Sequence, residues 1–174
     1  MLILKFLAKL IKILRSGATP GQIAAGFALG MIMGLTPLWT LHNFIVLLLL
    51  VVFNVNLSAA IFSFVLFSGF AYLLDPLFHN LGYFLLVNIP ALKPFWTTLY
   101  NTPVIALSRF NNTVVMGSLV SALVLLPFAF WGMRSFVIIY REKWDPKLQK
   151  LKIVQMVKGS KLYGWYEKIK ELGE

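Results

Sequence analysis

Cysteine is absent from this 174-residue chain, and charged residues are scarce. Without cysteine, disulfides, thiolate metal sites and cysteine nucleophiles are excluded. Charged residues make up 13% of the chain, against about 25% in a typical soluble domain. Asp75 is the only Asp, Glu, Lys or Arg between residues 16 and 92. A water-soluble fold cannot cover its surface with so few charges, so the soluble globular class is excluded.

Side chains suited to acid–base or metal chemistry are also few. The histidines are His42 and His79, and Asp75 is the only carboxylate before residue 142. A metal site needs about three or four protein ligands, a number that these side chains only just reach. Phosphate-loop and nucleophile-elbow motifs are missing. We therefore expect no enzyme, no cofactor and no metal.

Hydrophobic residues, in contrast, are abundant. They make up 59% of the chain, which excludes intrinsic disorder because disorder requires low hydrophobicity. The net charge of +10 comes from basic residues that flank apolar segments. That arrangement is typical of membrane topology and of contact with anionic lipid rather than nucleic acid. The composition therefore predicts an all-α integral membrane protein that crosses the bilayer more than once.

The first segment, residues 1–17, predicts an amphipathic helix in the membrane interface. At about 100° per residue, its basic side chains fall on one stripe and its apolar side chains on the opposite side. We expect the stripe to contact anionic headgroups, and its members are Lys5, Lys9, Lys12 and Arg15. The alternative is a helix that packs on the cytoplasmic face of the protein itself.

Two short apolar segments follow, joined at Thr36 and Pro37. Thr19-Pro20-Gly21-Gln22 is a capping-box pattern that predicts a helix running to about Leu35. The second segment covers about residues 38–53. Helices of sixteen residues measure about 24 Å, less than the ~30 Å hydrocarbon core. Both a thin transmembrane hairpin and a re-entrant hairpin satisfy this length.

A ladder of glycines runs along the first of these segments. Gly26, Gly30 and Gly34 recur every four residues and so share one helix face. Such a face is typical of close helix packing, and we favour this interpretation over a thin face beside a lipid or substrate path.

The next apolar span begins at Leu57 and reaches the pair Asp75-Pro76. Because proline can either kink or end a helix, the span is one long helix hinged at Pro76, or a helix followed by a second one. In the second case Asp75 caps the new helix. In the first, an ionisable residue at membrane depth indicates function.

The remaining chain comprises a connector, a long apolar segment and a basic tail. Residues 90–111 carry prolines, aromatics and two basic residues, which suit the headgroup region. Asn112 or Thr113 then caps an apolar segment that extends to about Tyr140. The tail, residues 141–174, predicts two amphipathic surface helices separated by Gly159. The organisation is therefore residues 1–17, one membrane domain over 18–140, and the cytoplasmic tail.

The distribution of Lys and Arg orients the chain. Four basic residues precede the first apolar segment and nine follow Tyr140, whereas the 90–111 connector has two. The positive-inside rule places both termini in the cytoplasm, so the number of crossings is even. Two crossings with a re-entrant hairpin, or four crossings, satisfy the count.

The run from residue 19 to about residue 75 resembles an uncharacterised bacterial membrane family, domain of unknown function 2062. The resemblance rests on three motifs, namely the PGQIAAGFALG start, the GLTP turn, and the pair Asn56-Leu57 before a small-residue helix. The family's Asn-Pro pair, about a dozen residues later, is Ser68-Gly69 here, and Asp75-Pro76 is a shifted candidate. The resemblance implies a bacterial inner-membrane protein.

Polar side chains gather in two places that the orientation puts at the outer ends of their segments. If they meet, they form one site that binds a polar headgroup or responds to pH. The candidate site residues are His42, Asn43, Asp75, His79 and Asn80.

Two functions fit these features. The first is a lipid- or small-molecule-handling, transporter-like component, because broken helices with polar turns form transporter sites. The second is a membrane anchor or assembly subunit of a cell-envelope complex. Expected partners are membrane lipids with anionic headgroups, further copies of the chain, or a larger envelope protein.

Overall fold

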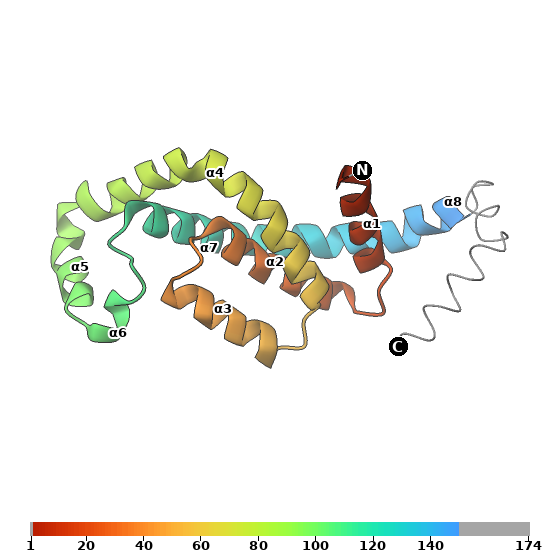
Figure 1. Cartoon of the computed structure of the whole chain (residues 1–174), viewed down its shortest axis with the longest axis horizontal. Coiled ribbons are helices and arrows are strands. Elements are labelled where there is room, and N and C mark those ends of the chain that lie inside the picture. The colour runs from red at the N-terminus through yellow and green to blue at the C-terminus, as the bar shows by residue number, and fades with distance from the viewer. Residues whose placement is uncertain (1, 150–174) are drawn as a thin grey trace. The chain divides into compact units, whose positions relative to one another are not determined.

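The computed structural model describes residues 2–149, and within that range it contains helices and no strand (Figure 1). The all-α class is therefore confirmed. The two tail helices expected around Gly159 lie outside the described residues. The chain divides into two compact units between Ser135 and Phe136. The elements are α1 (Leu2–Leu14), α2 (Pro20–Leu35), α3 (Leu41–Val52), α4 (Leu57–Val87), the 3-10 turn Pro90–Leu92, α5 (Lys93–Tyr100), α6 (Pro103–Ala106), α7 (Thr113–Ile139), the π-helical turn Tyr140–Trp144, and α8 (Asp145–Gln149).

Two helical stretches are long and apolar enough to cross a membrane. They are α4 and the stretch Thr113–Leu148, which contains α7. In the most apolar 18 residues of each stretch, only 22% and 28% of the residues are buried, respectively. The core helix of a soluble protein would be mostly buried, so these helices expose their apolar surface as membrane helices do.

Local capping determines where the helices begin. Thr19 and Gln22 form the expected capping box at the start of α2. Asn56 accepts a hydrogen bond from the Ala59 N–H at the start of α4 (2.8 Å). Asn112 accepts two from the start of α7. These side chains satisfy N–H groups that a helix itself leaves unpaired.

α4 continues through Asp75-Pro76, so the structure has the first of the two alternatives, one long helix, and Asp75 does not cap a new one. Ending a helix would leave about four carbonyl and four N–H groups without partners, which is costly in apolar surroundings. Continuing it costs mainly the hydrogen bond that Pro76 cannot donate to the Tyr72 carbonyl. The helix therefore continues and curves along its length (Figure 1).

The glycine ladder of α2 lies against α4, and the two helices run in the same direction (Figure 1). A Cβ atom at any of the three glycines would collide with backbone atoms of α4. The facing residues recur every four positions on both helices, in the pairs Gly26 with Asn56, Gly30 with Ala60, and Gly34 with Phe64. The hydrogen bond from Asn56 N–H to the Gln22 carbonyl (3.0 Å) anchors the start of this contact.

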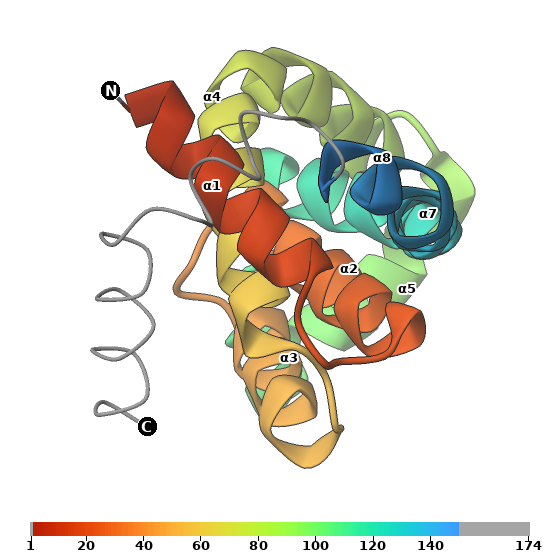
Figure 2. The ribbon, with the colours of Figure 1, turned by 90° about the vertical axis from the view of Figure 1, so that its right-hand side faces the viewer.

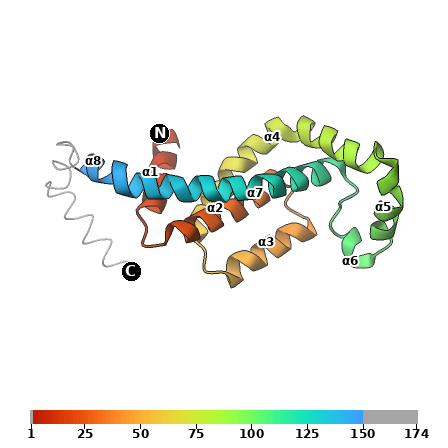
Figure 3. The same cartoon turned by 180° about the vertical axis from the view of Figure 1, so that it is seen from behind.

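A second pair of glycines, which the sequence analysis did not single out, joins α4 to α7. A Cβ at Gly82 would overlap the Thr113 carbonyl, and one at Gly117 would overlap the Phe78 carbonyl. These two helices therefore run antiparallel. Figure 3 shows α7 lying beside α2 as well. Helices α2, α3, α4 and α7 all contribute to one buried core, made of Met31, Ile32, Leu35, Val46, Leu50, Ala60, Phe78 and Ala122.

Part of the apolar face of α1 packs on the protein itself (Figure 2). Ile13 and Leu14 are buried, and the Phe6 ring stacks on Phe62 of α4 with centroids 4.3 Å apart. Lys9 and Lys12 remain exposed. These two members of the cationic stripe are thus exposed on a helix that is held against α4.

Candidate functional site

Asn43 closes the turn between α2 and α3. Its side-chain amide donates to the Pro37 carbonyl (2.8 Å) and to the Leu38 carbonyl (3.2 Å). Its Oδ1 accepts from the Thr36 hydroxyl (3.1 Å). Because Asn43 is almost fully buried, these bonds satisfy polar groups that would otherwise be costly to bury. The amide therefore holds the turn in shape.

His42 belongs to the same turn. The Thr40 hydroxyl donates its one hydrogen to the Pro37 carbonyl (3.1 Å). The Thr40 hydroxyl oxygen therefore accepts the hydrogen bond from His42 Nε2, 2.9 Å away. This arrangement assigns the proton to Nε2. Nδ1 is buried without a hydrogen-bond partner among the described residues. Desolvation of the half-buried ring lowers the pKa of His42, so the ring is neutral at pH 7.

The turn and the middle of α4 together enclose a cavity of 520 Å³, named here the turn cavity. Asp75 and Tyr72 come from α4, and Thr36 and Pro37 come from the turn. Among the described residues, no hydrogen bond or ion pair ends on the Asp75 carboxyl. The full lining is Met33, Gly34, Leu35, Thr36, Pro37, Leu38, Phe64, Val65, Ser68, Ala71, Tyr72 and Asp75.

The turn cavity is mostly apolar, and the polar groups that line it include several hydrogen-bond acceptors. Asp75 contributes its carboxyl group, and the Tyr72 carbonyl lacks a helical donor because Pro76 has no N–H. The last residues of α2 also line it, and the carbonyl end of a helix carries partial negative charge. The lining contains no Lys, Arg or His. Such a site favours a cation or a group that donates hydrogen bonds.

The five predicted polar residues do not form one hydrogen-bonded site within the described part of the chain. Asp75 shares the turn cavity with the turn, but His42 and Asn43 are not part of its lining. His79 Nδ1 instead lies 2.7 Å from the Thr113 hydroxyl, which links α4 to α7. Asn80 is exposed. No group of three metal-ligating side chains is found in the range that the structure describes.

Sequence reasoning missed Ser68 and Tyr72 as neighbours of Asp75 in this cavity. A signal was present, because positions 68, 72 and 75 are four and three residues apart and share a helix face. It could be recognised only if α4 continued past residue 74, which the Asp-Pro pair left open.

Comparison with known proteins extends the resemblance beyond residues 19–75. The family model described as "Uncharacterized protein conserved in bacteria (DUF2062)" matches residues 4–145. A relative from Treponema pallidum (strain Nichols), named "Uncharacterized protein", is 29% identical over 160 residues, which cover 91% of this chain and 98% of the relative. No solved structure matches the chain. The matched range includes α2, α3, α4, α7 and the turn cavity.

Proposed function

This chain belongs to the bacterial family DUF2062, and we propose that it is a transporter-like component of the inner membrane. In this proposal it is not an enzyme, and it handles a cationic or amine-bearing small molecule or lipid headgroup. The observation that carries the proposal is the turn cavity, a mostly apolar space that is lined by the Asp75 carboxyl group and by the carbonyl end of α2.

Helix lengths motivate the proposed membrane arrangement. With 16 and 12 residues, α2 and α3 measure about 24 Å and about 18 Å, both short of the ~30 Å core. Their turn lies beside the middle of α4, which continues for twelve residues beyond Asp75. We propose that α2 and α3 form a re-entrant hairpin, while α4 and α7 cross the bilayer. Both termini are then cytoplasmic, and the turn cavity faces the outer side.

Asp75 gives this arrangement a functional interpretation. A carboxylate at the centre of a membrane helix costs about 2.5–3.5 kcal/mol on insertion scales. In the described residues nothing compensates it by hydrogen bonding or ion pairing. Transporters place coupling cations where short helices end in carbonyl groups. The C-terminal end of α2 beside Asp75 provides the same combination of groups.

A second candidate function is a membrane anchor or assembly subunit. One face of α3 favours it, because large apolar side chains there are exposed to lipid or to a partner, namely Phe44, Ile45, Leu47, Leu48, Val51 and Val52. A larger envelope protein or further copies of this chain could cover that face. Anionic lipid at the cationic stripe of α1 is compatible with either function.

Cysteine labelling tests the proposal. Because the chain has no cysteine of its own, only the introduced cysteine reacts. Ser68→Cys lies in the turn cavity, whereas Leu73→Cys is a control on the same helix, at a side chain that is 75% exposed outside that lining. A membrane-impermeant maleimide added outside intact cells should label Ser68→Cys and spare Leu73→Cys. If Ser68→Cys reacts from neither side of the membrane, the cavity is closed to water and the proposal is wrong.

Purification with native lipids separates the two functions. If the chain has the transporter-like function, an amine-bearing lipid or a small cation should co-purify with the wild type. Less of that molecule should co-purify with Asp75→Asn. A large protein in stoichiometric amount, unaffected by Asp75→Asn, would instead support the anchor.

A further inference from the structure

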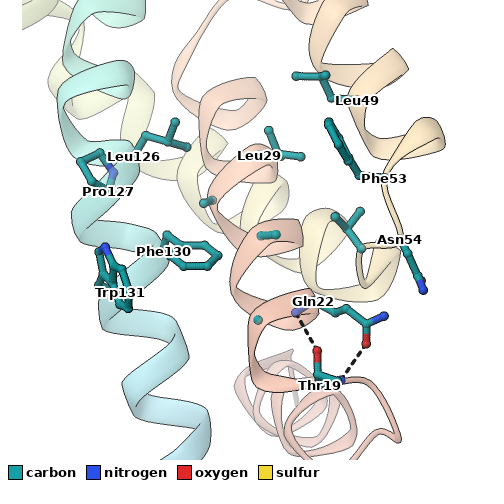
Figure 4. A pocket seen from close by; sticks show the side chains of 14 residues that line it. Thr19, Gln22, Leu29, Leu49, Phe53, Asn54, Leu126, Pro127, Phe130 and Trp131 are labelled. Atoms are coloured by element: carbon teal, nitrogen blue, oxygen red, sulfur yellow. Dashed lines mark hydrogen bonds between the residues drawn. The ribbon is translucent and has the colours of Figure 1, made fainter.

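A larger cavity lies between α2, α3 and α7, within the first compact unit (Figure 4). This cavity, the apolar groove, has a volume of 730 Å³. Its lining is apolar over most of its length, and Figure 4 shows Leu29, Leu49 and Leu126 at one end. Thr19 and Gln22 lie at the other end, where α2 begins.

A second, polar cavity of 320 Å³ adjoins that end. It shares Gln22, Asn54 and Val55 with the apolar groove. Asn56 and Ser58 add further polar side chains, and Ala18 completes the contact with the segment before α2. An apolar cavity and a more polar one therefore adjoin at these three residues. Both volumes fall in the range of about 300–1,000 Å³ that is usual for ligand pockets.

The polar cavity offers several hydrogen-bond donors. The Gln22 side-chain oxygen accepts the Thr19 N–H (2.8 Å), which leaves its NH₂ group for another acceptor. Leu57 and Ser58 occupy the first positions of α4, where N–H groups have no intrahelical partner. The starts of α2 and α4 both bring the positive ends of their helix dipoles to this cavity.

α1 adds positive charge at the same place. The Asn56 amide donates to the Ser16 hydroxyl (3.3 Å), which fixes the end of α1 beside the polar cavity. Lys12 is exposed one turn before that end, and Arg15 directly precedes Ser16. Residues 1–74 contain four basic residues and no acidic one. The charge around the polar cavity is therefore complementary to an anion.

We propose that the two cavities together bind one anionic phospholipid, with an acyl chain in the apolar groove and the phosphate in the polar cavity. The amide NH₂ groups of Gln22 and Asn54 and the Ser58 hydroxyl donate to the phosphate oxygens. The site is separate from the turn cavity, which lies at the opposite end of α2 and is mostly apolar with several acceptors. Either site can therefore fail experimentally without the other.

Lipid binding to the purified, delipidated full chain tests the proposal. Native mass spectrometry in non-ionic detergent should count one bound phosphatidylglycerol, with at least tenfold weaker binding of phosphatidylcholine. Ala25→Phe fills the apolar groove and should weaken phosphatidylglycerol binding at least tenfold. The matched control, Gly69→Phe, adds the same ring to α4 at a position with no atom within 4 Å of its Cβ and outside the cavity linings, and it should bind as the wild type does. Wild-type binding by Ala25→Phe would overturn the proposal.

The polar part is tested separately. Asn54→Leu should lower the preference for phosphatidylglycerol over phosphatidylcholine, whereas Asn80→Leu, at an exposed asparagine of α4, should not. An unchanged preference in Asn54→Leu would remove the phosphate from this cavity. Inorganic phosphate should bind the wild type weakly, and binding as tight as that of phosphatidylglycerol would show an anion site without an acyl chain.

A measurement on the wild type covers the case that Ala25→Phe fails to fold. Trp131 lines the apolar groove, so phosphatidylglycerol with brominated acyl chains should quench its fluorescence. Trp131→Phe removes that component and leaves quenching of the other tryptophans as the background. If the two proteins lose the same intensity, no acyl chain occupies the groove and the proposal is wrong.

Discussion

Replacing Gly30 by alanine adds a single methyl group at the closest contact between α2 and α4. The new Cβ would lie 2.8 Å from both the Cα atom and the carbonyl carbon of Ala60, and closer still to the carbonyl oxygen. Carbon atoms pack at about 3.5–4.0 Å. The atoms that the new Cβ meets belong to the Ala60 backbone, which cannot rotate away as a flexible side chain can. The two helices must therefore separate by about 1 Å.

The energetic cost follows from that separation. Overpacking a tight contact costs about 1–3 kcal/mol, and a gap of about 1 Å forfeits up to half of the attraction of each separated contact. Gly26 and Gly34 lie on the same face and lose contacts as well. The higher helix propensity of alanine recovers about 1 kcal/mol at most. We expect a net loss of about 2 kcal/mol, or about 4–8 °C in Tm for a chain of this size.

Thermal unfolding in detergent, followed by circular dichroism, measures this loss. Gly132→Ala is a matched control within α7, because no atom lies within 4 Å of its Cβ position. It should leave Tm unchanged or raise it slightly through helix propensity. Gly30→Leu should be far worse than Gly30→Ala and abolish folded protein. A Gly30→Ala chain as stable as Gly132→Ala would refute the packing of the ladder on α4.

The remaining predictions concern topology, lipid contact and pH. Reporter fusions at residues 1 and 174 should show cytoplasmic ends, and one at residue 100 an external connector; an external C-terminus would contradict the orientation. Glutamine at the four positions of the cationic stripe, Lys5, Lys9, Lys12 and Arg15, should weaken binding of the N-terminal peptide to anionic vesicles by about 1 kcal/mol per residue. If the unmodified peptide binds neutral vesicles as tightly as anionic ones, the contact is not driven by charge. Burial lowers the pKa of His42 in the folded protein, so as the pH falls the histidine is protonated first in the unfolded protein. The Tm in detergent should therefore stay constant above about pH 6.5 and decrease as the pH falls towards the folded-state pKa. His42→Gln should remove that part of the pH dependence, and an unchanged pH profile would show that His42 does not contribute to it.

Several features followed from the sequence because local physical rules determine them. Composition was enough for the all-α class with helices able to cross a membrane. The start of α2 was predicted correctly from Thr19 and Gln22, because a capping box involves residues only three apart. The start of the next span at Leu57 was also correct, because Asn56 satisfies the first turn of its own helix.

Other features depended on partners that lie far away along the chain. The spacing of Gly26, Gly30 and Gly34 indicated a close approach of two helices, but spacing does not identify the partner, and only packing shows α4 against this face. Gly82 and Gly117 are isolated in the sequence, so the contact between α4 and α7 gave no periodic signal.

The polar residues illustrate the same limit. Asp75 and His79 are four apart on one helix, yet His79 bonds to Thr113 of α7 while Asp75 lines the cavity with the turn. Four residues advance the helix by about 40° beyond a full turn, which is enough to direct two side chains to different neighbours. Sequence alone placed them on one face. Which neighbour each one meets was decided by tertiary packing, in which α2 contacts the first half of α4 and α7 contacts its second half.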